Sequence, residues 1–246
     1  MIAYVARELD TGRTLSAHDD VQLPSYSTIK TLLAAAFWRM VARGELDDAD
    51  PYAFAPGSCV GGAGILRGLR HPATLSLADL LHLALVVSDN DATNIITSFV
   101  GFDRVNALAG ELRLTRTRMQ RIMADWEAAA AGRENLTSAG DLARLFEALA
   151  GGGPLEPFVC ERVLASLELQ EHLDGIARYL PSEAAYAGKC GDDSPAGRYA
   201  HDSALIREAD RRAVVVVMTR DSGGFETVAR TGAALYAALG EGRASV

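Results

Sequence analysis

A serine and a lysine lie three positions apart at the start of an apolar helical pattern, in the stretch SYSTIKTLL at residues 25–33. A serine hydroxyl attacks an acyl carbon only if a nearby base takes its proton. Ser27 and Lys30 are one helical turn apart, so both side chains can lie on the same face. Backbone N–H groups at a helix start favour negative charge on Ser27 and disfavour the protonated amine of Lys30. The structural alternative is that Ser27 is only an N-cap, since serine is preferred there.

Two further segments carry residues of the kind that acyl transfer needs. VVSDNDATN at residues 86–94 contains Ser88 and Asn90, and AGKCG at residues 187–191 contains Lys189. A leaving amine needs an acid within hydrogen-bond reach, and a second lysine in one cleft lowers the pKa of the first. The alternatives are a polar turn at residues 88–90 and a solvated lysine on an edge strand.

In this order the three segments resemble the Ser-x-x-Lys, Ser-Asp-Asn and Lys-Thr-Gly motifs of the class A β-lactamases and related penicillin-binding serine enzymes. The likeness continues through LDTGR, GGAGILRGL, SLADLLHLALVVSDNDATN and VGFDRVN. It therefore covers nearly the whole chain.

The resemblance implies a catalytic role for each motif residue. Ser27 would be the acylated nucleophile, with Lys30 as its proton acceptor or relay. Ser88 would pass a proton to the leaving nitrogen. The oxyanion hole would consist of the backbone N–H groups of Ser27 and of Asp192, which follows Gly191. Such donors act on charge that appears only in the transition state.

The resemblance also implies residues that bind the substrate. Asn90 would hold the amide side chain of the substrate, and Lys189 would attract its carboxylate, on the strand that Gly191 and Asp192 continue. Arg198 is a candidate second anchor, because a guanidinium binds a carboxylate in a two-pronged fork. A surface role for Arg198 is the alternative.

The chain departs from the family pattern in the loop ahead of Thr137 and beside Lys189. The lactamases carry a glutamate that activates water to release the acyl group, and gap-free counting back from Thr137 puts it near Met123, which is not acidic. Asp125 and Glu127 could serve if the loop is drawn differently, or they could be solvated carboxylates of a helix. Cys190 replaces the usual hydroxyl residue, and a thiol is a weaker donor.

The periodicity predicts an α+β fold. Strand patterns at both ends of the chain predict one antiparallel sheet flanked by helices, including a terminal helix, with an all-helical lobe inserted between. The hairpin turn Asp10-Thr11-Gly12 opens the sheet. The predicted division is residues 1–22 plus 181–246 against 23–180, with the site at the interface and a β-lactamase/transpeptidase-like fold.

Composition excludes several kinds of partner. A net charge of −8 argues against nucleic acid, and no apolar run reaches the length of a membrane span. Three distant cysteines and scattered histidines indicate no metal site, and the chemistry needs no cofactor. The start lacks a signal-peptide pattern, which predicts a cytoplasmic protein, although an exported mature form without its leader would read the same. We expect a monomer or a weak homodimer.

The sequence therefore predicts a serine acyl hydrolase that opens β-lactams or similar acyl amides without a cofactor. The nearest alternative is a penicillin-binding protein, D-alanyl-D-alanine peptidase or esterase that releases its acyl group slowly. A non-catalytic ligand-binding relative is the alternative from another class.

Overall fold

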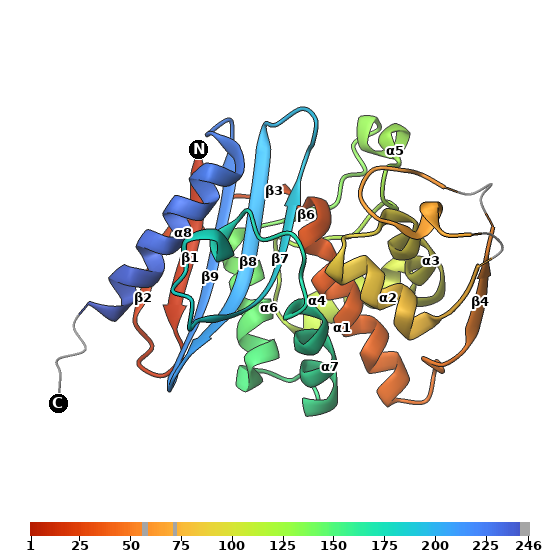
Figure 1. Cartoon of the computed structure of the whole chain (residues 1–246), viewed down its shortest axis with the longest axis horizontal. Coiled ribbons are helices and arrows are strands. Elements are labelled where there is room, and N and C mark those ends of the chain that lie inside the picture. The colour runs from red at the N-terminus through yellow and green to blue at the C-terminus, as the bar shows by residue number, and fades with distance from the viewer. Residues whose placement is uncertain (56–58, 71–72, 242–246) are drawn as a thin grey trace.

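The computed structural model describes residues 1–55, 59–70 and 73–241, and it has an α+β fold (Figure 1). Both chain ends supply a five-stranded antiparallel sheet in the order β2-β1-β9-β8-β7. Its strands are β1 (Ile2–Glu8), β2 (Thr14–Ala17), β7 (Ala185–Asp192), β8 (Tyr199–Glu208) and β9 (Arg211–Arg220). The predicted hairpin around Asp10-Thr11-Gly12 is confirmed, because β1 pairs with β2.

The sheet is buried on both faces, which explains the continuous apolar run of β9. Successive side chains of a strand point to opposite faces. Val214, Val216 and Met218 therefore join the core that contains the helices before β7, whereas Val215 and Val217 join a second core. Helix α8 (Gly224–Gly240) covers that second face, as Figure 1 shows.

Most of the chain between the outer strands is helical, and α6 packs against the inner face of the sheet. The α-helices of this part are α1 (Ile29–Ala42), α2 (Leu77–Val86), α3 (Asn90–Val100), α4 (Phe102–Glu111), α5 (Trp126–Ala130), α6 (Ala139–Glu147) and α7 (Pro157–Leu167). Shorter helical turns are η1 (Tyr26–Thr28), η3 (Leu66–Gly68), η4 (Ala148–Gly152) and η5 (Ile176–Tyr179).

The predicted all-helical segment also contains two short antiparallel pairs. β3 (Leu23–Pro24) pairs with β6 (Leu136–Thr137), and β4 (Pro51–Phe54) pairs with β5 (Ala73–Ser76). The first pair ties the start of η1 to the loop that precedes α6. One hydrophobic core runs from the helices to the inner face of the sheet. The proposed division at residues 22 and 181 stays a prediction, and its two parts would share this core.

Helix α2 begins with a capping box. The Ser76 hydroxyl accepts from the N–H of Asp79, and the Asp79 carboxylate accepts from the N–H of Ser76. This reciprocal pair satisfies donors that a helix start leaves free. Among the described helices, none is both long and apolar enough to cross a bilayer.

Candidate active site

Ser27 lies in the helical turn η1, directly ahead of α1. The turn is fixed by Ser25, whose carbonyl accepts from the N–H of Thr28 at 3.2 Å and from the Thr28 hydroxyl at 2.7 Å. No side-chain capping bond forms at the start of η1 or of α1. The interpretation of Ser27 as an N-cap is therefore wrong.

Lys30 lies in the first turn of α1, and its side chain is 0 % exposed. Its Nζ contacts the Ser88 carbonyl oxygen at 2.7 Å, the Ser88 Oγ at 3.1 Å and the Asn90 Oδ1 at 2.9 Å. Burial lowers the pKa of Lys30 well below its ordinary value, and the nearby charge of Lys189 lowers it further. Burial and the neighbouring lysine thus make the protonated amine less favourable than in water.

Ser88 and Asn90 lie at the junction of α2 and α3. Ser88 has a positive φ of 54°, which is uncommon for a residue with a side chain. Asp89 caps α3 by accepting from the N–H of Ala92 at 2.9 Å, and its other oxygen accepts from the N–H of Leu66 at 2.7 Å. The polar turn that the sequence offers as an alternative is present, and it directs Ser88 and Asn90 toward Lys30.

Several residues of segment 59–66 form hydrogen bonds with the junction of α2 and α3. The N–H of Val60 donates to Asp91 Oδ1 at 2.6 Å, and the Asn90 Nδ2 donates to the Gly61 carbonyl at 3.1 Å. A Cβ on Gly62 would lie 2.6 Å from the Asn90 Nδ2. Glycine suits this position because its φ is 77° and because the Asn90 amide packs closely against it.

Strand β7 places its Lys-Cys-Gly segment beside η1. A Cβ on Gly191 would lie only 2.6 Å from the backbone nitrogen of Ser27, so the strand passes directly against the start of the turn. Lys189 is 0 % exposed, and its amine donates to the Cys190 carbonyl at 3.2 Å. Burial lowers the pKa of Lys189 and raises the pKa of the Cys190 thiol to about 11. The alternative of a solvated surface lysine is wrong.

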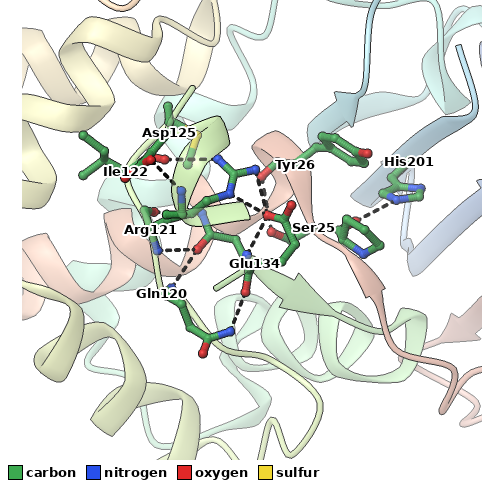
Figure 2. Close-up of polar contacts among 12 residues, drawn as sticks. Ser25, Tyr26, Gln120, Arg121, Ile122, Asp125, Glu134 and His201 are labelled. Atoms are coloured by element: carbon green, nitrogen blue, oxygen red, sulfur yellow. Dashed lines mark hydrogen bonds and ion pairs between the residues drawn. The ribbon is translucent and has the colours of Figure 1, made fainter. Parts of the chain in front are cut away.

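The loop before β6 is held by charged and amide side chains at its two ends (Figure 2). The Arg121 guanidinium forms an ion pair with Glu134 at 2.7 Å, although Arg121 is only 5 % exposed. Asn135 Oδ1 accepts from the N–H of Gln120 at 2.7 Å and from the N–H of Arg121 at 3.1 Å. These bonds fix the path of the loop past Ser27.

Met123 is held by a separate pair of bonds to α3. Its N–H donates to Asn94 Oδ1 at 2.7 Å, and its carbonyl accepts from Asn94 Nδ2 at 3.1 Å. The next residue, Ala124, has a positive φ of 60°. Both residues line the same cleft as Ser27.

That cleft has a volume of about 420 Å³ and brings together parts of every motif. Of the residues of the three segments, Ser27, Ser88, Asn90, Gly191 and Asp192 line it, whereas Lys30 and Lys189 do not. Its other lining residues are Tyr26, Val60, Gly62, Ala63, Arg121, Met123, Ala124, Trp126, Asn135, His172, Cys190, Asp193 and Ser194. The hydroxyls of Ser27 and Ser88 thus line one cavity, and the buried amine of Lys30 contacts Ser88 from behind the cleft wall.

Residues 2–240 match the sequence profile described as the β-lactamase enzyme family. The chain belongs to this family. A β-lactamase from Sphaerobacter thermophilus is 26% identical in sequence, covers 97% of this chain and 90% of its own, and has a TM-score of 0.88. The penicillin-binding protein PBP-A is 24% identical with a TM-score of 0.87, covering 98% of this chain and 90% of its own.

A curated relative has a different description. The β-lactamase regulatory protein BlaB of Streptomyces cacaoi is 36% identical over 96 residues. That match covers 38% of this chain and only 30% of BlaB. The chain thus spans less than a third of the length of this curated relative.

Asp125 and Glu127, the two carboxylates that the sequence offers as water-activating groups, do not line the cleft. Asp125 Oδ1 accepts from the N–H of Ala128 at 2.9 Å and so caps α5, and Glu127 is exposed in the first turn of that helix. Neither is among the described residues that line the cleft. The expectation that one of them faces Ser27 needs correction, because the helix start and solvent take both carboxylates.

Arg198 does not reach the cleft either. Its guanidinium lies 3.0 Å from Asp221 on the exposed side of the sheet end. Arg198 is therefore a surface residue, which is the alternative that the sequence leaves open to a carboxylate anchor.

Sequence reasoning missed the residues that hold the loop, namely Arg121, Glu134, Asn135 and Asn94. One signal was available: a buried arginine needs a charged partner, and Glu134-Asn135 stands just before β6. No pattern in the chain reveals which arginine is buried. Tyr26, which lines the cleft beside Ser27, was also missed.

Proposed function

We propose that this β-lactamase-family protein opens β-lactam amides through an acyl-Ser27 intermediate and releases the acyl group slowly. The observation that carries the proposal is the buried amine of Lys30, in contact with Ser88 and Asn90 beside the Ser27 cleft. A lysine acts as a base only when its pKa is lowered, and burial does this here.

The acceptors around Lys30 specify the direction of its lone pair. A neutral amine has two N–H bonds and one lone pair. The Ser88 carbonyl and the Asn90 amide oxygen can only accept, so both N–H bonds are used on them. The lone pair is then left for the Ser88 hydroxyl, whose Oγ lies 3.1 Å from Nζ. This arrangement suits an amine that exchanges a proton with Ser88, and in our proposal the same amine takes the proton of Ser27 from the preceding turn.

In the proposed reaction, Ser27 Oγ bonds to the carbonyl carbon of the β-lactam while its proton moves to Lys30. The N–H groups of Ser27 and Asp192 stabilise the oxyanion, and removal of one such donor typically costs about 10²–10³ in rate. The carbon–nitrogen bond then breaks. Ser88 gives its proton to the leaving nitrogen and takes one from Lys30, so the net result is that Ser27 loses one proton and the nitrogen gains one.

Release of the acyl group is expected to be slow, because it needs an activated water. The loop contributes five residues to the cleft wall, and none of them carries a carboxylate or imidazole base: Arg121, Met123, Ala124, Trp126 and Asn135. The two carboxylates predicted from the sequence lie outside the cleft lining. This supports the penicillin-binding, D-alanyl-D-alanine peptidase or esterase alternative over rapid turnover.

A second candidate function is a regulatory ligand binder that is not acylated. The regulatory description of the relative BlaB favours it, although that match covers only part of either chain. Such a protein would bind a β-lactam in the cleft without forming a covalent bond.

One experiment separates these functions. The protein is mixed with benzylpenicillin and its intact mass is followed over time, with a chromogenic cephalosporin assayed in parallel. We expect an adduct of the full penicillin mass, a burst of cephalosporin opening equal to the protein concentration, and slow turnover afterwards. Ser27→Ala should lose both signals. Ser98→Ala, an exposed serine on α3, should keep them.

The other outcomes are equally informative. Rapid turnover without an accumulating adduct would contradict slow release and indicate an efficient lactamase. Absence of an adduct, together with reversible penicillin binding by calorimetry, would reject acylation and support the regulatory candidate.

A further inference from the structure

The end of the cleft that follows β7 carries two carboxylates, Asp192 and Asp193. Asp192 Oδ1 accepts from the N–H of Ser194 at 2.6 Å, and Asp193 Oδ1 accepts from the N–H of Tyr199 at 2.9 Å. Both side chains are partly exposed, and within the described chain neither forms an ion pair. Backbone donors orient them without neutralising their charge.

The arginines near this end are already paired with other carboxylates. Arg121 forms its ion pair with Glu134 at 2.7 Å, and Arg198 forms its ion pair with Asp221 at 3.0 Å. Each pair is close to neutral. Arg198, which the family resemblance offers as a carboxylate anchor, therefore forms its ion pair with Asp221, and its charge acts on Asp193 only as a weaker, longer-range interaction.

The two lysines are set back from the surface of the cleft. The amine of Lys189 is buried and donates to the Cys190 carbonyl, and the amine of Lys30 is bonded to Ser88 and Asn90. Neither lysine is among the residues that line the cleft. Burial also lowers the pKa of both, which disfavours their protonated forms, and the charge of Asp192 acts on Lys189 in the opposite direction.

An aromatic pair lies beside the carboxylates. The rings of Tyr26 and Tyr199 have centroids 5.5 Å apart, and Tyr26 lines the cleft. Burial raises the pKa of Tyr26, and the charge of Asp193 raises it further, which places Asp193 close to this phenol. Aromatic faces attract cations. His172 is the remaining titratable side chain on the cleft wall outside the groups already named.

We infer that this cleft discriminates by charge, favouring acyl substrates whose leaving group is cationic or uncharged over those whose leaving group carries a carboxylate. Asp192 and Asp193 are the specificity-determining residues. The inference rests on the proposed acylation of Ser27, because it concerns the group that lies against β7 as Ser27 is acylated.

The test uses three phenylacetyl thioesters that differ only in the departing thiol. The thiols are thiocholine, which is cationic, its neutral carbon analogue 3,3-dimethylbutanethiol, and 3-mercaptopropionate, which is anionic. In each reaction the Ser27 oxygen bonds to the acyl carbon, the carbon–sulfur bond breaks, and the proton of Ser27 leaves with the thiol. All three produce the same phenylacetyl-Ser27, so differences arise in acylation alone.

Acylation is measured by intact mass, and each rate constant is divided by the rate of hydroxide cleavage of the same thioester without protein. Opposite charges a few ångströms apart at a protein surface interact strongly enough to change a rate by about tenfold. We expect the cationic thioester to react about ten times faster than the anionic one, with the neutral one between them. In about 0.5 M salt the ratio should shrink toward one.

Matched variants test whether Asp192 and Asp193 cause the difference in acylation rate between the thioesters. Asp192→Asn with Asp193→Asn keeps both oxygen acceptors but removes both charges, and the cation-to-anion ratio should fall to about one. Asp103→Asn, an exposed carboxylate in the first turn of α4, should keep the wild-type ratio. The salt series on wild-type protein tests the inference even if the double variant does not fold.

Failure of the inference differs from failure of the proposed function. If all three thioesters acylate Ser27 and the anionic one reacts as fast as the cationic one or faster, charge discrimination is rejected and acyl transfer stands. If no thioester and no penicillin gives an adduct that Ser27→Ala abolishes, the proposed function is rejected and the inference falls with it.

Discussion

Met123 places an apolar thioether on the cleft wall at the position where gap-free counting expects a water-activating carboxylate. Its backbone is fixed on both sides by Asn94, so a substitution there changes the side chain without freeing the loop. Met123 is only 6% exposed, and the exposed part faces the cleft. A carboxylate at this site would be partly desolvated, which raises its pKa and improves it as a base.

We therefore expect Met123→Glu to shorten the lifetime of the acyl-Ser27 adduct. General base catalysis typically contributes about 10²–10⁴ in rate, so a gain toward the lower figure is expected. The measurement is the decay of the penicillin adduct by intact mass. Ile122→Glu is the matched control, because Ile122 is the exposed neighbour outside the cleft lining. An unchanged lifetime in folded Met123→Glu would remove this position from the release step.

The nucleophile segment could be predicted from sequence because its chemistry is local. Ser27 and Lys30 are one turn apart, and residue types alone indicate what such a pair can do. The release step could not be predicted in the same way. The positions of Asp125 and Glu127 depend on the loop path, which the distant partners Glu134 and Asn94 set through bonds to Arg121 and Met123.

At the scale of elements, β7 and η1 are packed at backbone distance. Gly191 allows this contact because it has no side chain. A Cβ would lie 2.6 Å from the Ser27 nitrogen and 3.0 Å from the Thr28 nitrogen, and both of these atoms belong to backbone that cannot rotate away. The contact fixes the spacing between the two proposed oxyanion donors.

Gly191→Ala should therefore push the strand and the turn apart and slow acylation of Ser27 by about 10² or more, since misplaced donors lose most of their effect. The rate of penicillin adduct formation measures this. Gly110→Ala in α4 meets no atom within 4 Å and should leave the rate unchanged while raising the stability of the helix slightly. Wild-type acylation in Gly191→Ala would mean that this contact does not position the donors.

Element types were more predictable than their pairings. The hairpin of β1 and β2 has its turn residues in sequence, and α2 carries its own capping box. The pair of β3 and β6 joins Leu23 to Thr137, more than one hundred residues away, and no local periodicity reports such a partner. The separate turn η1 ahead of α1 has no signal of its own in the sequence, and it starts at Tyr26, which has a positive φ of 47°.

Over the whole molecule, His201 links the sheet to the nucleophile segment and is fully buried. Its Nδ1 accepts from the N–H of Thr219 at 3.3 Å, so the other nitrogen, Nε2, carries the proton and donates to the Pro24 carbonyl at 3.0 Å. Only the neutral ring satisfies both contacts. Burial lowers the pKa of His201 to about 4.

Because the pKa of His201 is lowered in the folded protein, the free energy of unfolding depends on pH. A histidine in the unfolded chain has a pKa of about 6.5. Between pH 6.5 and 4 the unfolded state binds more protons at this site than the folded state, so the free energy of unfolding falls as the pH falls. The shift of the His201 pKa from 6.5 to about 4 corresponds to a total loss of roughly 3 kcal/mol in the free energy of unfolding. Above pH 6.5 the folded state keeps this stabilisation in full.

We expect denaturant unfolding at pH 7.5 and pH 4.5 to show this loss in the wild type and a smaller loss in His201→Gln. Glutamine keeps a donor and an acceptor but does not titrate, so the variant should be less stable at pH 7.5 and less sensitive to acid. His18→Gln, at an exposed histidine, should retain the wild-type sensitivity. An equal loss of stability in wild type and His201→Gln would show that another group controls the acid response.

The same variant tests whether His201 also positions the nucleophile. In His201→Gln at pH 7.5 the acylation rate of Ser27 should fall, because Pro24 and the turn that follows it lose their anchor to β8.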